Sequence, residues 1–131
     1  MREVLAAADY TDKGITQVLG VDTLNRLGER KFPVLLRRAS GKTPLETLIQ
    51  LFILGEPVDI AAAARAFAPM ALDEWVNIGL VSQNGSLVHP TVQLRCFQGL
   101  VIAYDFIRRG PVDCNGTMSW GYHPVLCLWQ A

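Results

Sequence analysis

The amino-acid sequence predicts a mainly helical α+β protein in which short N-terminal helices precede a winged helix-turn-helix. Apolar residues recur at helical spacing in three successive segments between Thr43 and Gly79. The dipeptide Asn84-Gly85 then gives a strong signal for a two-residue β-hairpin. Extended segments follow on both sides of a second turn at Gln98-Gly99. Three helices, a β-hairpin wing and a further strand form the order expected of a winged helix.

The first elements are short helices. Residues 4–8 form a compact apolar cluster, and Thr11 or Asp12 can cap the turn that follows it. Gly20 ends that turn, whose apolar residues share one helical face: Ile15, Val18 and Leu19. Asp22 can cap a further helix that stops at Gly28 and carries Leu24 and Leu27.

Residues 32–42 are predicted to be non-helical. Pro33 disfavours helical backbone in the residue before it, so residues 32–36 are expected to be extended. Residues 39–42 have the composition of a linker. We therefore expect residues 1–42 to form an N-terminal helical segment followed by a basic linker.

The winged helix is predicted over residues 43–106. It starts at a capping box, Thr43-Pro44-Leu45-Glu46, whose proline occupies the first helical position. The helix that follows is apolar on nearly all sides and closes at Gly55, which places it at the centre of a small domain. Residues 56–58 are expected to form a turn.

Two shorter helices and the wing come next. Asp59 is the predicted N-cap of a helix over residues 60–67, which residues 68–70 end. A third helix runs from residue 72 to Gly79, with Asp73 and Glu74 in its first turn. Residues 80–83 lead into the Asn84-Gly85 hairpin, and residues 87–96 continue as extended backbone. Pro90 in that segment suits only an edge or a bulge.

The segment after the second turn, residues 100–106, is the last strand of the predicted winged helix. Residues 107–131 are expected to form an irregular tail with one short strand at residues 125–128.

Charge suggests one candidate surface. The 131 residues carry a formal net charge of zero, so attraction of the whole protein to nucleic acid is not expected. Cations nevertheless gather in one stretch whose only acidic residue is Glu29: Arg26, Arg30, Lys31, Arg37, Arg38 and Lys42. This basic strip is either a solvated surface or a contact for a polyanion or substrate.

The predicted third helix argues against specific DNA binding. It contains Asp73 and Glu74 but no lysine or arginine, and the predicted wing tip, residues 83–86, is uncharged. A helix that reads the major groove needs donors for phosphates and for guanine. Trp75 on the same helix is either part of the core or an exposed anchor for a partner.

No catalytic or metal site is expected. Cys114, His123 and Cys127 lack the close pairs of a zinc knuckle, so structural thiols are the better interpretation. His89 and Cys96 are separated by an odd number of residues, which would place them on opposite faces of a regular strand.

The cellular context follows from composition. Three cysteines at irregular spacing, no signal peptide and no apolar run long enough to span a bilayer indicate a cytoplasmic protein without a membrane segment.

Three motifs carry a resemblance to a known family. They are Leu94-Arg95-Cys96-Phe97, Leu72-Asp73-x-Trp75-x-x-x-Gly79-Leu80-Val81 and Pro44-Leu45-x-Thr47-Leu48-Ile49-x-Leu51-Phe52-x-Leu54-Gly55-Glu56-Pro57-Val58. Over residues 4–113 the chain resembles the N-terminal domain of a bacterial family of class I S-adenosylmethionine-dependent methyltransferases. In that family a winged-helix-like module precedes the catalytic domain and helps to present the substrate.

The resemblance implies recognition rather than catalysis. Family members continue beyond the position of Asp113 into a glycine-rich cofactor loop and an Asn-Pro-Pro-Tyr-type motif, and residues 114–131 match neither. We therefore expect no catalytic, cofactor-binding or metal residue in this chain. The chain is then a truncated, frameshifted or stand-alone form that contacts a catalytic domain or its RNA or protein substrate.

Two other functions are kept as hypotheses. One is a stand-alone winged-helix transcription regulator that binds DNA. The other is a protein-interaction module that uses apolar residues near Trp75 or Trp120.

Overall fold

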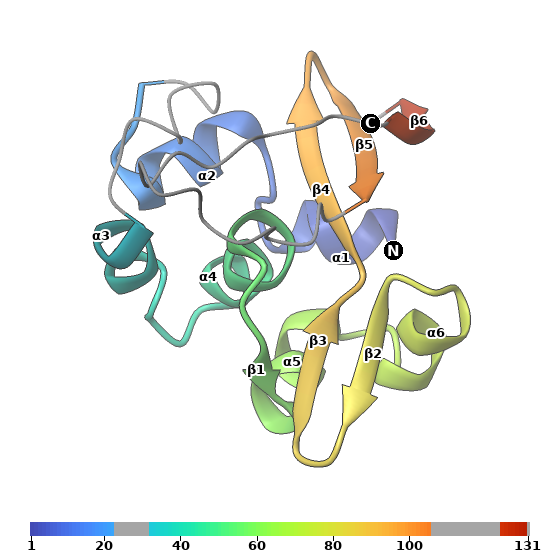
Figure 1. Cartoon of the computed structure of the whole chain (residues 1–131). Coiled ribbons are helices and arrows are strands. Elements are labelled where there is room, and N and C mark those ends of the chain that lie inside the picture. The colour runs from blue at the N-terminus through green and yellow to red at the C-terminus, as the bar shows by residue number, and fades with distance from the viewer. Residues whose placement is uncertain (23–31, 106–123, 131) are drawn as a thin grey trace, which may run out of the picture.

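The described residues of the computed structural model, 1–22, 32–105 and 124–130, combine helices with two small antiparallel sheets (Figure 1). The helices are α1 (Arg2–Ala7), α2 (Asp12–Leu19), α3 (Phe32–Arg38), α4 (Pro44–Ile49), the π-helix η2 (Gln50–Leu54), α5 (Ile60–Phe67) and α6 (Leu72–Asn77). The strands are β1 (Val58–Asp59), β2 (Val81–Asn84), β3 (Leu87–Pro90), β4 (Val92–Phe97), β5 (Leu100–Asp105) and β6 (Pro124–Gln130). The mixed composition predicted from the sequence is confirmed.

Side-chain caps start three of the helices at the predicted residues. The Thr11 hydroxyl accepts a hydrogen bond from the Gly14 N–H at the start of α2. Thr43 and Asp59 accept in the same way at the starts of α4 and α5. Each cap satisfies one of the backbone donors that a first helical turn leaves without a partner.

The extended backbone predicted for residues 32–36 is wrong, because these residues belong to α3. Proline is tolerated in the first turn of a helix, where its missing N–H is not needed, and Pro33 is the second residue of α3. Leu35 on the same helix is buried in the core. The helix predicted between Asp22 and Gly28 falls on residues 23–31, outside the described part of the chain.

The central helix has an unexpected second half. The predicted α-helix ends at Ile49, and the chain continues as η2, in which the Gly55 N–H donates to the carbonyl of Gln50. A π-helix leaves carbonyls near its end without the usual partners, and side chains supply some of the bonds. Gln93 Nε2 donates to the carbonyl of Ile53 at 3.3 Å. The side chain of Gln50 has a different role, since its Nε2 donates to the carbonyl of Ala39, directly after α3, at 2.6 Å and so ties η2 to the end of α3.

The first sheet has the strand order β1-β3-β2. Residues 58 and 59 therefore form a strand that pairs with β3, where the sequence suggested only a turn for residues 56–58. Asn84 pairs with Leu87, so the turn residues of the hairpin are Gly85 and Ser86, one position later than predicted. Gly85 has φ +62°, a conformation that suits glycine at the first central position of a tight hairpin turn.

The second sheet has the order β4-β5-β6. The predicted turn at Gln98-Gly99 is confirmed, since Phe97 pairs with Leu100 and both turn residues have positive φ. However, β4 and β5 do not join the β2–β3 hairpin, because the chain bends at Thr91 between β3 and β4. Strand β6 includes the short strand predicted at residues 125–128, so residues 124–130 are not irregular.

One continuous hydrophobic core joins these elements. It extends from Val4 in α1 to Ala103 in β5 and includes every residue from Leu51 to Leu54 of η2. Figure 1 shows α4 near the centre, with α2 and α3 on one side and the two sheets on the other. The described part of residues 1–42 thus packs in the same core as the predicted winged helix. No described helix has the length and apolar character needed to cross a membrane.

Candidate interaction surfaces

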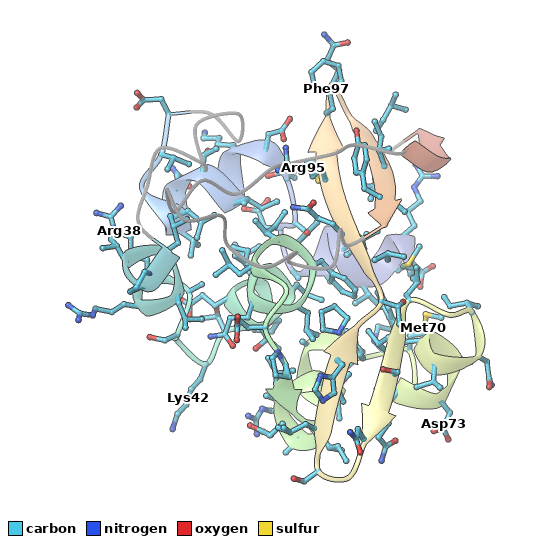
Figure 2. The ribbon with its side chains drawn as sticks, in the orientation of Figure 1. Arg38, Lys42, Met70, Asp73, Arg95 and Phe97 are labelled. Carbon is cyan, nitrogen blue, oxygen red and sulfur yellow. The ribbon has the colours of Figure 1, made fainter. Side chains whose placement is uncertain are left out.

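The basic strip is described only in part. Arg26, Arg30 and Lys31 lie outside the described residues. Arg37 and Arg38 occupy the last turn of α3, and Lys42 precedes α4; all three are exposed. Figure 2 shows Arg38 and Lys42 directed outward on the same side of the molecule.

Arg38 has a structural contact of its own. Its Nη1 donates to the carbonyl of Leu19, the last residue of α2, at 2.8 Å. A cationic side chain at this place satisfies a terminal carbonyl and interacts favourably with the helix dipole. The contact needs a glycine at position 20. Gly20 has φ +64°, and a Cβ atom added to it by any substitution would lie 1.7 Å from Arg38 Nη1. Arg37 and Lys42 are therefore the better candidates for an external anion.

The outer face of α6 is acidic. Asp73, Glu74 and Asn77 are exposed, as is Ile78 directly after the helix, and α6 contains no cation. The tip of the β2–β3 hairpin, residues 83–86, is exposed and uncharged. Figure 2 places Asp73 on the side of the molecule away from Arg38 and Lys42. The exposed cations of α3 and the carboxylates of α6 thus lie on different sides.

Trp75 faces inward from α6 and is completely buried. Its ring stacks on Phe67 of α5, with 4.3 Å between ring centroids and 13° between planes. The ring centroid of Phe52 in η2 lies 5.8 Å from that of Trp75. The core alternative for Trp75 is confirmed, and the prediction that it contacts a partner is wrong, because the packing of α5 and η2 leaves no exposed ring. Its indole N–H has no hydrogen-bond partner among the described residues.

Cys96 is a packed thiol rather than a nucleophile. It lies in β4, whereas His89 lies in β3 of the other sheet. Its Sγ donates to the carbonyl of Tyr10 at 3.2 Å. Burial, with a smaller contribution from the charge of Asp12, raises the pKa of the Cys96 thiol to about 12. Such a group stays protonated at neutral pH, where only a thiolate would react readily.

The described residues offer no metal site, since nowhere among them do three His, Cys, Asp or Glu side chains gather suitably. Cys114 and His123 fall outside the described part of the chain, and Cys127 lies on β6.

Sequence reasoning missed two features. Tyr10 contacts β4 through both its hydroxyl and its carbonyl, and nothing local in the sequence marks it. Phe97 is 55% exposed at the end of β4. The predicted turn at Gln98-Gly99 could have indicated that Phe97 sits at a hairpin end.

Comparison with known protein families shows where the chain belongs. A family model described as a domain of unknown function (DUF7059) matches residues 7–91, a segment that ends at the bend between β3 and β4. No curated protein and no solved structure matches the chain. The family match covers more than half of the chain, and the chain therefore belongs to the DUF7059 family.

Proposed function

We propose that this chain is an accessory recognition domain of an S-adenosylmethionine-dependent methyltransferase, and that it contacts the substrate or a partner rather than the cofactor. The proposal rests on the resemblance of the motifs in residues 44–58, 72–81 and 94–97 to the N-terminal domain of such enzymes. Among the described residues, the only buried thiol, Cys96, is protonated and hydrogen-bonded inside the core.

We also propose that residues 43–90 are a winged helix. The element order α4–η2, β1, α5, α6, β2, β3 and the strand order β1-β3-β2 support this assignment. In this assignment α6 takes the place of the recognition helix and the β2–β3 hairpin is the wing. The strands β4 and β5, which the sequence suggested as part of the same unit, form a separate sheet.

The observation that supports the substrate-contact part of this proposal is the separation of charge on the surface. In a DNA-reading winged helix, the exposed face of the recognition helix would supply donors to phosphates and bases. Here that face presents Asp73 and Glu74, which repel a phosphate backbone. Arg37 and Lys42 are exposed elsewhere, on α3 and in the loop before α4. These two cations are the part of the basic strip that supports contact with an anionic substrate such as RNA.

The test is fluorescence anisotropy with a labelled hairpin RNA at several salt concentrations. We expect salt-dependent binding that Arg37→Glu/Lys42→Glu weakens at least tenfold, because each phosphate contact adds to the electrostatic part of the affinity. The matched control, Asp73→Asn/Glu74→Gln, changes two charges on α6 and should not weaken binding. Equal loss in both variants, or no RNA binding by the unmodified chain, would contradict an RNA-contacting role for the basic strip.

Cofactor binding is tested separately by calorimetric titration with S-adenosylmethionine. We expect no heat of binding, because the resemblance carries over no cofactor-binding residue. Micromolar affinity would overturn the assignment as an accessory domain.

A winged-helix DNA-binding regulator is the second candidate, and the strand order of the first sheet favours it. It predicts binding to duplex DNA whose logarithmic salt dependence reflects several phosphate contacts. Neutralising Asp73 and Glu74 should then strengthen binding, since α6 would lie against the duplex. Absence of any shift of a duplex at low salt would remove this candidate.

A further inference from the structure

Tyr10 and β4 hold each other by two reciprocal hydrogen bonds. The Tyr10 hydroxyl donates to the carbonyl of Leu94 at 2.8 Å. In return, the Cys96 thiol donates to the carbonyl of Tyr10 at 3.2 Å. All three residues are buried. Burial raises the pKa of the Tyr10 hydroxyl well above its ordinary value, so it remains a donor at neutral pH.

These bonds lie at the outer edge of the second sheet. Among the described strands β4 pairs only with β5, so none of them lies along its other edge. Phe97 and Leu100 pair directly beside the two-residue turn, which is the position of a hydrogen-bonded pair in such a hairpin. Hydrogen-bonded and non-hydrogen-bonded pairs then alternate along the two strands, so Leu94 and Cys96 fall at non-hydrogen-bonded positions. The backbone groups of Leu94 and Cys96 therefore point away from β5. The Tyr10 hydroxyl satisfies one of these outward groups, the carbonyl of Leu94.

The contact also joins two parts of the chain. Tyr10 connects α1 to α2 and lies within the family segment 7–91, whereas Leu94 and Cys96 lie beyond it. The connection is tightly bent, with φ +57° at Asp9 and a hydrogen bond from the Thr11 N–H to the Asp9 carbonyl. The Tyr10 N–H donates to the carbonyl of Leu5, which ties the bend to α1.

We infer that the Tyr10–Leu94–Cys96 contact is a latch that holds the second sheet against the N-terminal helices. When the latch opens, α1, the α1–α2 connection and β4 separate locally while the first sheet and α5–α6 remain folded. Local openings of this kind occur in cooperative units below the free energy of global unfolding. The opening exposes the Cys96 thiol together with the backbone carbonyl of Leu94 that the Tyr10 hydroxyl covers.

The thiol provides a direct readout in the unmodified protein. The full chain is treated with iodoacetamide at several urea concentrations, and alkylation of Cys96 is measured by peptide mass spectrometry, which separates it from Cys114 and Cys127. We expect a rate of Cys96 alkylation that rises less steeply with urea than global unfolding does, because a local opening exposes less surface. A rate that follows global unfolding at every urea concentration would overturn the latch.

A pair of matched variants tests the role of the hydroxyl. Tyr10→Phe keeps the ring and removes the donor to Leu94, so Cys96 alkylation should become about fivefold faster, the usual effect of losing one hydrogen bond. Amide exchange in α1 and β4 should accelerate with it, while exchange in β2, β3 and α5 stays unchanged. Tyr104→Phe makes the same change on the central strand β5 and should leave Cys96 protected. A uniform acceleration in all elements, or an equal effect of both variants, would contradict the inference.

Discussion

At the scale of single residues, the burial of Trp75 determines what α6 can present to solvent. The stack of Phe52, Phe67 and Trp75 takes one ring from each of η2, α5 and α6. Because the ring of Trp75 points into this stack, Asp73 and Glu74 on the same helix point outward. The acidic character of the outer face is thus a consequence of core packing.

Truncation of this residue should be costly. We expect Trp75→Ala to lower the free energy of unfolding by about 3–5 kcal/mol, since it leaves a large cavity between three elements. Trp75→Phe should cost less, because it keeps an aromatic ring and removes an indole N–H that has no partner among the described residues. Urea denaturation followed by circular dichroism measures both. Ile78→Ala, at a side chain that is 55% exposed, is the control and should change stability by less than about 0.5 kcal/mol. Equal stability of Trp75→Ala and Ile78→Ala would show that Trp75 does not pack in the core.

At the scale of elements, local signals predicted how most helices begin and end. Asp59 shows this most clearly, because its carboxylate accepts from the Ala62 N–H at 2.8 Å at the start of α5. We expect Asp59→Ala to reduce stability by about 1 kcal/mol, the usual cost of losing an N-cap. Asp59→Asn keeps an oxygen acceptor and should lose only a fraction of that. The midpoint of urea denaturation compares the two, and an equal loss would mean that charge rather than the cap bond is responsible.

The elements that sequence reasoning missed depend on distant partners. Strand β1 has only two residues, too few for any periodicity, and exists because Val58 and Asp59 meet β3 about 30 positions later. Helix α3 could not be predicted, because Pro33 near its start disfavours helical backbone in the preceding residue and the burial of Leu35 is visible only in the folded core. The separation of β4 from β3 likewise depends on the pairing of β4 with β5. The local signals for it are Pro90 and the bend directly after it.

Some features of the candidate surfaces can be predicted from the sequence, and others depend on the fold. The lack of cations on α6 and the presence of the basic strip are visible in the sequence alone. That Arg38 caps α2 could not be predicted, since its acceptor, the carbonyl of Leu19, is 19 positions away. Local composition therefore indicates the sign of a surface, whereas the tertiary fold decides which of its charges are available to a ligand.

At the scale of the whole molecule, the continuous core couples the protonation of buried groups to global stability. Tyr10 and Cys96 belong to the core cluster that also contains Leu51 to Leu54 of η2. Burial raises the pKa of both groups. The unfolded chain exposes both groups, so it releases their protons at a lower pH than the folded chain does. Over the pH range between these two values, the free energy of unfolding must fall as the pH rises.

Stability should consequently fall in alkaline solution. The pKa of Cys96 is raised from 9.0 to about 12, so its contribution is fully present below pH 9 and is lost as the pH rises toward 12. Between pH 8 and pH 10.5 the thiol alone should lower the free energy of unfolding by at most about 2 kcal/mol, because solvent near the thiol reduces the effect. Tyr10, whose pKa lies well above 10.0, adds a loss of the same sign above pH 10. Denaturant unfolding at the two pH values measures the change in the free energy of unfolding. In Cys96→Ala this change should be smaller by the amount attributed to the thiol. If the unmodified chain and Cys96→Ala lose stability equally, the buried thiol is not the group that couples folding to pH.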